Sequence, residues 1–439
     1  MDKRIVIVGA GVAGINAATK LVDNGYPGEL ITIIDKGNDP INRLPEEVMT
    51  GMLGAGGWSD GKLTYHTSIG GQLSKYCGEE KAMELMKQVV DNFTRFHPKP
   101  EEIFMSDPQE EPEFIKPYFG LRMFPVWHIG SNYLHEIAKT WYQYLLDKGV
   151  YFSWNLEVID IDFENNIVIT DSIETYGYDE LIFAVGKSGI DFAQQLADDY
   201  ELPNEPKSVQ IGVRFEAPQK YFQKLIDVSY DFKLYQKFDN VSLRSFCTNN
   251  NAAYVAVEET YGDISYNGHA KKGEEFRNNM TNFGILMEIK GIEDPFAWSR
   301  DVVQKLQSDG TGLYYSPSRT VSTTSEGNKV SATQIGWLEL IKVAEAMNPY
   351  FEYVVNFIDD MKKVFEFGDD WGMYIPEVKY LSPEPLVNYH NLSLTTYPNV
   401  YFVGDALSAR GITVSGAHGI YVAEKLIQHN HLVDLTSTN

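Results

Sequence analysis

The amino-acid sequence predicts an α/β protein, with a discontinuous domain around a parallel sheet and a second, α+β domain around an antiparallel sheet. Its 439 residues are enough for two or three domains. Short apolar segments near both ends of the chain, at 5–8 and 400–403, each run into a glycine-rich turn that opens a helix. Between 209 and 289, aromatic and β-branched residues recur in the pattern of antiparallel strands.

The first apolar segment, residues 5–8, has the β-branched composition of a strand buried on both faces. Gly9, Gly11 and Gly14 follow it with the G-x-G-x-x-G spacing, and Ala13 lies among them. In such a unit the first glycine makes a tight turn, the second lets the backbone approach a pyrophosphate, and the third lets helix pack on strand. The spacing predicts a Rossmann dinucleotide-binding unit with phosphates at the helix N-terminus.

A second strand ends on Asp35, about twenty residues after the glycines. A carboxylate at this position can accept hydrogen bonds from a ribose hydroxyl. We include the nearby Lys36 and Arg43 in the predicted binding surface.

Near the C-terminus, an apolar strand runs directly into Gly404 and Asp405, and a second glycine turn at Gly411 and Ile412 opens a helix. This arrangement resembles the second flavin-contact motif of FAD-dependent oxidoreductases that share the glutathione-reductase type of FAD domain. The resemblance implies that Asp405 bonds the ribityl chain. It also implies that the backbone at Gly411 and Ile412 directs a helix N-terminus at the flavin ring, where it stabilises negative charge.

Two further segments favour FAD over NAD as the bound nucleotide. Residues 149–158, which end on Val158, have the form of the strand that lies beside the adenine in these proteins. Residues 179–186 form a strand that passes Ala184 and closes on Gly186. The resemblance therefore implies a glutathione-reductase-type Rossmann FAD domain, assembled from separate parts of the chain, that holds FAD non-covalently.

A narrower resemblance rests on a series of short motifs. They are Gly54–Leu63, Trp127–Ser131, Gly186–Gly189, Ile211–Glu216, Arg244–Cys247 and Tyr266–Gly268. In this order they resemble a family of uncharacterised FAD-dependent dehydrogenases, related more distantly to geranylgeranyl-reductase-like flavoproteins and flavin hydroxylases. The chain departs from that pattern at Gly130-Ser131-Asn132, where Gly-Thr-Asp is expected, and after Cys247. The resemblance implies a fold and a cofactor but no particular substrate.

The segments between these motifs predict the remaining elements. Strands are expected at Val209–Glu216, Val241–Phe246, Ala253–Glu258 and Phe283–Ile289. Helices are expected at Glu79–Arg95, at Pro295–Lys305 and within Gln334–Phe367, where Pro349 divides the run in two.

The predicted domain boundaries follow from this order. The FAD-binding domain takes residues 1–75, 125–205 and 385–439, a helical and loop insertion takes 76–124, and a substrate domain takes 206–384. No second dinucleotide fingerprint follows the first. We therefore expect no dedicated NAD(P)H domain: a nicotinamide donor, if one is used, binds transiently, or the substrate itself reduces the flavin.

The loop Ser59-Asp60-Gly61-Lys62 follows the flavin-binding glycines and is expected to pass close to the flavin ring. Lys62 is a candidate catalytic residue because its charge could stabilise the anionic reduced flavin or orient a substrate carboxylate. In the alternative, Asp60 caps a turn and Lys62 lies in solvent.

Two further candidates are His128, whose proton can move near neutral pH, and Arg410, which could hold a carboxylate or phosphate. A core histidine bonded to backbone is the alternative for His128. In the substrate domain the charged residues Arg214, Glu216, Arg244 and His269 indicate either a polar cavity wall or an ion-pair network.

The net charge of −24 and the pI of about 4.8 disfavour nucleic acid and anionic membranes as partners. The only cysteines, Cys77 and Cys247, exclude a disulfide framework and a four-cysteine iron–sulfur cluster, and we expect both to be buried structural thiols. No cluster at ligand spacing indicates a metal site. With no signal sequence or membrane span predicted, we expect a cytoplasmic protein.

The leading hypothesis is an FAD-dependent oxidoreductase, a dehydrogenase or reductase that acts on a small organic substrate by hydride transfer at flavin N5. A flavin monooxygenase or a prenyl-lipid-type reductase on the same architecture is the alternative enzyme. An FAD-dependent nucleic-acid- or tRNA-modifying protein and a non-catalytic flavin-binding partner are alternatives of other classes.

Overall fold

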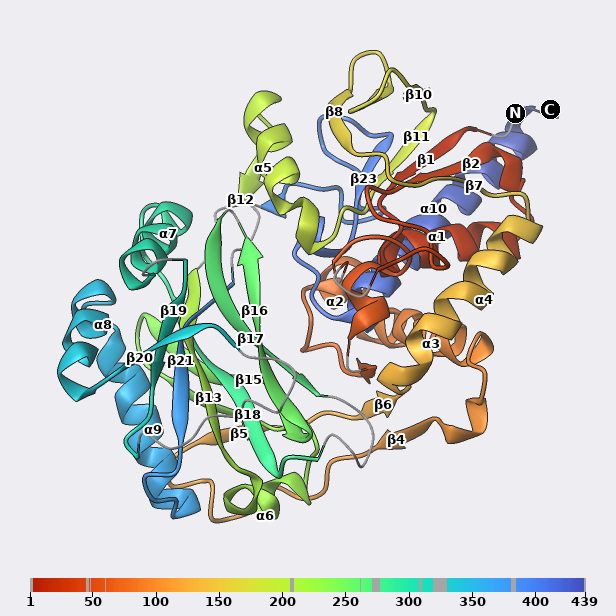
Figure 1. Ribbon diagram of the computed structural model, residues 1–439. Coiled ribbons are helices and arrows are strands. Elements are labelled where there is room, and N and C mark those ends of the chain that lie inside the picture. The colour runs from red at the N-terminus through yellow and green to blue at the C-terminus, as the bar shows by residue number, and fades with distance from the viewer. Residues whose placement is uncertain are drawn as a thin grey trace. The chain divides into compact units, whose positions relative to one another are not determined.

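The computed structural model describes residues 3–44, 47, 49–59, 61–205, 209–260, 262–270, 277–307, 310–318, 330–379 and 384–437. The chain divides into two compact units (Figure 1). Unit 1 comprises Met1–Met105, Val126–Pro206 and Ser382–Asn439, and unit 2 comprises Ser106–Pro125 and Lys207–Leu381. Residues 76–105 of the predicted insertion 76–124, with its helix Glu79–Arg95, belong to unit 1, and residues 106–124 belong to unit 2.

Unit 1 is built around a parallel sheet with the strand order β23-β11-β1-β2-β7. These strands are β1 Ile5–Val8, β2 Ile31–Ile34, β7 Tyr151–Ser153, β11 Glu180–Phe183 and β23 Val400–Phe402. Every residue of β1, β11 and β23 is buried, as expected for apolar strands covered on both faces. The first and last parts of the chain therefore meet in one sheet.

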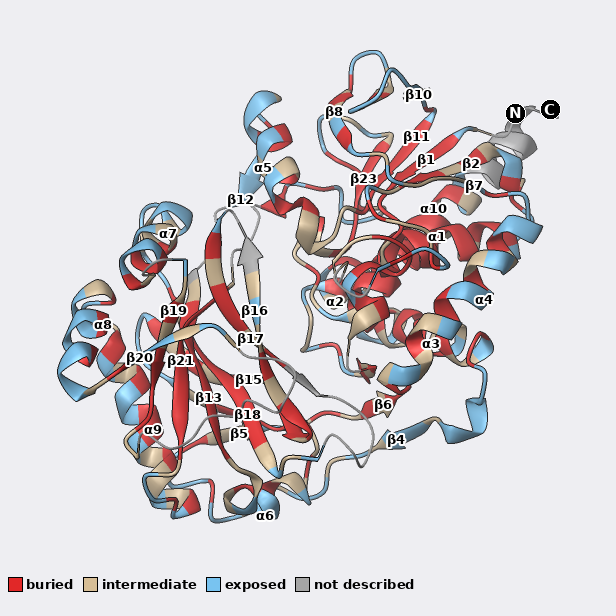
Figure 2. Ribbon diagram, viewed as in Figure 1, coloured by how far each residue is buried: buried red, intermediate tan, exposed pale blue. Residues whose placement is uncertain are grey.

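Three helices of unit 1 pack together beside this sheet: α1 Val12–Asp23, α3 Glu79–Arg95 and α10 Ile412–Ser437. Figure 2 shows α1 and much of α10 as buried. A Cβ at Gly419 would lie 2.0 Å from the carbonyl oxygen of Ala13, so only glycine permits this approach of α10 to α1.

Shorter elements complete unit 1. The helices are α2 Leu73–Cys77, α4 Leu134–Asp147 and α5 Ile190–Asp199. The strands form a β3-β6-β4 sheet (Lys62–Thr64, Val126–His128, Phe104–Ser106), an antiparallel β10-β9-β8 sheet (Thr175–Gly177, Ile167–Thr170, Val158–Asp162) and a β12-β22 pair (Asn204–Glu205, Glu384–Pro385).

Unit 2 is built around a sheet with the order β20-β19-β21-β13-β18-β15-β14-β5. Its strands are β5 Gly120–Arg122, β13 Val209–Pro218, β14 Lys233–Lys237, β15 Val241–Asn251, β18 Met280–Ile289, β19 Gly312–Tyr315, β20 Ala332–Ile335 and β21 Gly372–Lys379. Neighbours are antiparallel except β19 and β20. The four predicted strands of this region are confirmed as β13, β15, β18 and, outside this sheet, β16 (Ala253–Thr260).

The two faces of this sheet differ in chemistry. Side chains such as Val213, Phe215 and Phe283 point to one face and form an apolar core with the helices α7 Pro295–Leu306, α8 Leu340–Ala346 and α9 Phe351–Phe365. On the other face lies the hairpin of β16 Ala253–Thr260 and β17 Asp263–Ala270, and a short helix, α6 Gln223–Ile226, completes the unit.

A buried ion pair lies on the hairpin side of the sheet. Arg214, with no exposed surface, contacts the Glu377 carboxylate at 3.4 Å and donates to Asn282 Oδ1 at 2.7 Å. A Cβ at Gly268 of the hairpin would lie 1.5 Å from Arg214 Nη2, so glycine is needed where the hairpin crosses the guanidinium. Arg214 thus belongs to a buried ion-pair network, as one of the two interpretations of the sequence predicts.

Candidate functional site

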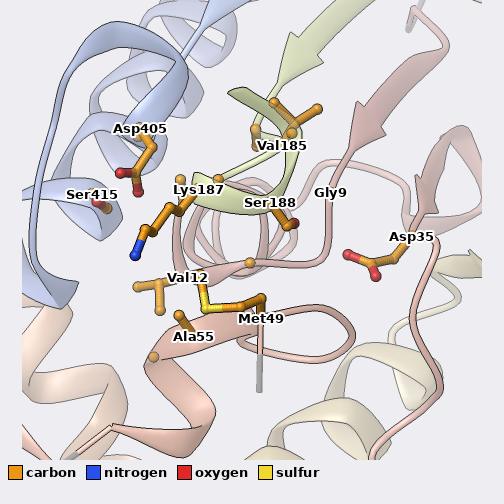
Figure 3. Close-up of a pocket in the computed structure, with 18 of the residues that line it drawn as sticks. Gly9, Val12, Asp35, Met49, Ala55, Val185, Lys187, Ser188, Asp405 and Ser415 are labelled. Atoms are coloured by element: carbon orange, nitrogen blue, oxygen red, sulfur yellow. The ribbon is translucent and has the colours of Figure 1, made fainter. Parts of the chain in front are cut away.

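A cavity of about 290 Å³ lies within unit 1, at the carboxyl ends of its parallel strands (Figure 3). Ligands of open parallel sheets bind at this edge. The lining comes from the turn after β1, the end of β2, residues 49–59 and 156–158, the segment after β11, and the turns that precede α10.

Most of the predicted cofactor-binding residues line this cavity. They are Gly9, Gly11, Ala13, Asp35, Lys36, Ser59, Val158, Ala184, Gly186, Gly404, Asp405, Gly411 and Ile412. Gly14, Arg43 and Gly61 are not among the lining residues, and Asp60 lies outside the described residues.

The three glycines after β1 have different surroundings. A Cβ at Gly9, where φ is +106°, would lie 2.4 Å from the carbonyl oxygen of Ala184. A Cβ at Gly14 would lie 2.2 Å from the carbonyl oxygen of Gly9. At Gly11, φ is −67°, and the nearest atom to a Cβ there, apart from its chain neighbours, would be the carbonyl oxygen of Ala184 at 3.8 Å. The protein itself therefore leaves room for a side chain at Gly11, and that room opens into the cavity.

Two helix N-termini reach the same cavity. The first intrahelical bond of α1 runs from Ile15 N to Gly11 O, and that of α10 runs from Ser415 N to Gly411 O. The N–H groups in the first turn of a helix have no intrahelical acceptor, and the helix dipole places partial positive charge there. Since Val12, Ile412 and Ser415 line the cavity, it is suited to anionic or polar ligand groups at two separate points.

Asp35 holds the end of β2 to its neighbours through backbone donors. Its Oδ2 accepts from Ala10 N, and its Oδ1 accepts from Gly37 N and Gly51 N, each at 2.8 Å. A carboxylate can accept about four hydrogen bonds. Oδ2 therefore has capacity for a ligand hydroxyl, while the three backbone bonds fix its orientation.

Asp405 lies at the other end of the cavity. Its carboxylate Oδ1 is 3.2 Å from Arg410 Nη1, and Arg410 also anchors the loop by donating its backbone N–H to Gly70 O at 2.6 Å. Figure 3 shows Asp405 and Ser415 on the side opposite Asp35. Three strand spacings separate β2 from β23, which corresponds to roughly 14 Å. The two carboxylates thus mark the ends of an elongated site.

The lining also includes residues that are not among the predicted cofactor-binding residues, such as Met49, Glu157, Lys187 and Ser188. Glu157 accepts from Lys36 Nζ at 3.0 Å. Lys187 extends its side chain into the cavity in Figure 3. Its position directly after a buried strand and a glycine was the available signal, because such segments lie at the ligand edge of a parallel sheet.

Arg43 braces the loop that lines the cavity. Its guanidinium donates to Met52 O at 2.6 Å and to Gly54 O at 2.9 Å, and it lies 5.4 Å from the centre of the Trp58 ring. Burial lowers its pKa to about 10, although Asp35 opposes this effect. The structure therefore places Arg43 behind the loop, where it supports the lining residues.

Lys62 and His128 are brought together, but away from the cavity lining. They are directly opposite each other in the β3–β6 ladder. His128 is buried and stacks on Phe104, with ring centres 4.5 Å apart. Gly61 has φ of +68° and a Cβ there would meet the backbone of Gly130 at 2.9 Å, so it serves the turn that leads into β3.

Both cysteines are free and only half-buried, which corrects the expectation of buried thiols. Desolvation raises the pKa of Cys77 to about 11, so a thiolate is not favoured there. Across the described ranges, no group of three or more His, Cys, Asp or Glu side chains could hold a metal ion. No helix in the described part of the chain is long and apolar enough to cross a membrane.

Comparisons with known proteins gave likenesses to solved structures only; no family model and no curated protein sequence matches the chain. A flavoprotein/dehydrogenase from Cytophaga hutchinsonii is 11% identical, with a TM-score of 0.44 over 98% of this chain and 78% of that one. A point mutant of halogenase PltM in complex with FAD is 10% identical, with a TM-score of 0.42 over 97% of this chain and 68% of that one. A mutant 2-methyl-3-hydroxypyridine-5-carboxylic acid oxygenase is 12% identical, with a TM-score of 0.38 over 97% of this chain and 83% of that one. With TM-scores below 0.5, the cofactor has to be inferred from the cavity itself.

Proposed function

We propose that the cavity of unit 1 binds FAD non-covalently and that the protein is an FAD-dependent oxidoreductase acting on a small organic molecule. The observation that carries this proposal is the space at Gly11: the fold tolerates a side chain there, but the cavity would lose the room in which a diphosphate reaches the N-terminus of α1. The backbone conformation at Gly11 does not require glycine. A ligand that approaches the backbone closely would account for glycine at this position.

The length of the site favours a dinucleotide over a mononucleotide. Asp35 would accept a hydrogen bond from the adenosine ribose, and Val158 would lie beside the adenine. About three strand spacings away, Asp405 would bond the ribityl chain, and the N-terminus of α10 at Gly411 would face the flavin ring. Each end of the predicted ligand thus meets a group of suitable chemistry.

Bound FAD would supply hydride transfer at flavin N5, so the protein itself needs to orient, shield and charge-balance the reacting groups. Lys187 would offset the diphosphate charge from within the cavity. Lys62, His128 and Arg410 remain our candidates for groups that act near the flavin or its substrate. Unit 2, which contains most of residues 206–384, is the candidate substrate domain.

The test is direct. The purified protein, or its apoprotein after incubation with FAD, should show the two-band absorption of bound flavin, and denaturation should release intact FAD. FMN and NAD at the same concentration should not compete, because neither carries both the adenosine ribose for Asp35 and the ribityl chain for Asp405. A protein that takes up no FAD under these conditions would refute the proposal.

The reaction is then assigned from anaerobic bleaching of the flavin. Bleaching by an organic substrate alone indicates a dehydrogenase. Bleaching by NADPH that becomes rapid only when substrate is present indicates the monooxygenase alternative.

A further inference from the structure

Two aromatic rings of unit 2 lie on the face of the sheet opposite helices α7–α9. Tyr235 of β14 and Phe246 of β15 occupy this face, while the alternating residues Leu234 and Leu243 belong to the apolar core on the helix side. Five cations surround the two rings. We call this set the basic-aromatic patch: Arg122, Lys233, Tyr235, Lys237, Arg244, Phe246 and Lys379.

The cations converge on the rings at short range. The Arg122 guanidinium and Lys237 Nζ lie 5.2 and 5.9 Å from the centre of the Tyr235 ring. Lys233 Nζ and the Arg244 guanidinium lie 5.5 and 5.7 Å from the centre of the Phe246 ring. Lys379 reaches the same ring from β21, although β13 and β18 lie between these strands. Cation–π attraction favours this gathering, but repulsion among the cations opposes it.

Several carboxylates lie near these cations. Asp231 contacts Lys233 at 3.1 Å, Glu288 faces Arg244, and Glu377 faces Lys379 but is also the partner of the buried Arg214. Glu258 faces Glu377 in turn. Among the groups in the described part of the chain that these contacts link, six cations, Arg214 included, face four carboxylates, whereas the whole chain has a net charge of −24. The patch therefore gathers five cations in one place on a protein that is acidic overall.

The patch is partly sheltered from solvent. Arg122 and Lys237 are exposed, whereas Tyr235, Arg244 and Phe246 are half-buried. Desolvation lowers the pKa of Arg244, and the charge of Arg122 lowers it further, while Glu288 acts against both. In such a setting a bound anion interacts more strongly than it would in water, and it would relieve the repulsion among the cations.

We propose that the basic-aromatic patch binds a small organic anion through a carboxylate or phosphate group. Arg244 supplies a planar guanidinium suited to either group, and Lys379 and Lys233 supply point charges beside it. The aromatic rings favour a ligand with an apolar body next to its charge. This site rests on unit 2 alone and does not depend on FAD binding in unit 1.

The test is a calorimetric titration of the full-length protein with benzoate, phenyl phosphate and the neutral benzyl alcohol. Saturable binding of at least one anion, with at least tenfold weaker binding of benzyl alcohol, is expected. R244Q should weaken binding of that anion at least tenfold. The matched control K363Q removes a cation from α9, away from the patch, and should leave the affinity for that anion unchanged. K237Q changes an exposed residue, so it should weaken binding of that anion several-fold without risk to folding.

Three results would overturn the proposal: no saturable binding of either anion, equal binding of benzyl alcohol, or full affinity in both R244Q and K237Q. Binding of a single-stranded 20-mer oligonucleotide but of neither small anion would also overturn it, in favour of a nucleic-acid partner. Flavin absorbance recorded on the same samples reports FAD occupancy separately. Failure of the FAD proposal and failure of this one are thus distinguishable.

Discussion

Gly11→Ala is the substitution that most directly tests the cofactor site. Alanine can adopt the φ of −67° found at Gly11, and its Cβ would come no closer than 3.8 Å to any atom beyond its chain neighbours. The new methyl group would instead occupy cavity space beside the N-terminus of α1. We therefore expect a protein that folds normally and binds FAD poorly.

The expected magnitudes separate binding from stability. As an N-cap, alanine is less favourable than glycine by roughly 0.5–1 kcal/mol. Alanine also has less conformational freedom in the unfolded chain, which stabilises the folded protein by about 0.4–1 kcal/mol. The free energy of unfolding should thus change by less than about 1 kcal/mol. A charge-assisted hydrogen bond lost between phosphate and backbone is worth roughly 1.5–3 kcal/mol, which corresponds to about 10- to 150-fold in Kd.

Gly9→Ala and Gly14→Ala are the matched controls. Their Cβ atoms would lie 2.4 and 2.2 Å from backbone oxygens, so both should lower the free energy of unfolding by at least about 2 kcal/mol. The assays are urea unfolding of the apoproteins and titration of each apoprotein with FAD, followed by flavin fluorescence. A wild-type Kd for FAD in Gly11→Ala, or a loss of stability as large as in the two controls, would contradict this prediction.

Three further predictions concern Arg43, Lys187 and His418. Arg43→Met removes hydrogen bonds to loop carbonyls and should lower the free energy of unfolding by roughly 2–4 kcal/mol, while saturating FAD restores occupancy; an unchanged urea midpoint would contradict this. Lys187→Met should weaken FAD binding roughly tenfold and reduce its dependence on salt, whereas Lys36→Met, beside Glu157, should have a smaller effect on both. His418 is fully buried with both ring nitrogens unbonded, and desolvation lowers its pKa to about 4. Because the unfolded chain takes up a proton below about pH 6.5, His418 should cost stability as pH falls from 6.5 towards 4, by up to about 3 kcal/mol, and His418→Leu should remove this part of the pH dependence of urea unfolding.

Local patterns in the sequence account for much of unit 1. Helix α3 spans Glu79–Arg95, as its apolar spacing predicts. A helix with one buried face shows this spacing within a few turns, so it can be recognised from a short stretch of sequence. In unit 2 the division of the long apolar run at Pro349 is confirmed by the gap between α8 and α9.

Other elements gave no local signal. Strand β21 contains Pro376, which argues against a central strand, yet it pairs with β13 on one side and β19 on the other. The ladder with β13 shifts register between Gly212 and Arg214, near the proline, and such an irregularity cannot be seen in a single strand. Strand β5 has three residues and depends on pairing with β14, far along the chain.

In the candidate site, too, local motifs can be predicted from the sequence, whereas contacts that depend on the path of the chain cannot. The glycine turns and Asp405 are local motifs, so the sequence predicts their position in the cavity lining. Arg43 was predicted to bind the cofactor because it lies close to Asp35 in the sequence. In the structure its guanidinium donates to backbone carbonyls within the same loop, a contact that depends on the path of the loop and that the residue type does not reveal.

Asp35 and Arg43 together give that loop a specific role. The three backbone bonds to Asp35 join the β1 turn, the end of β2 and Gly51, and Arg43 ties Met52 and Gly54 to the same loop. The position of the carboxylate that would meet the ribose therefore depends on the folding of the loop. A substitution that loosens the loop should thus weaken FAD binding through preorganisation, without touching a cofactor atom, and excess FAD should recover both occupancy and stability because it binds only the ordered form.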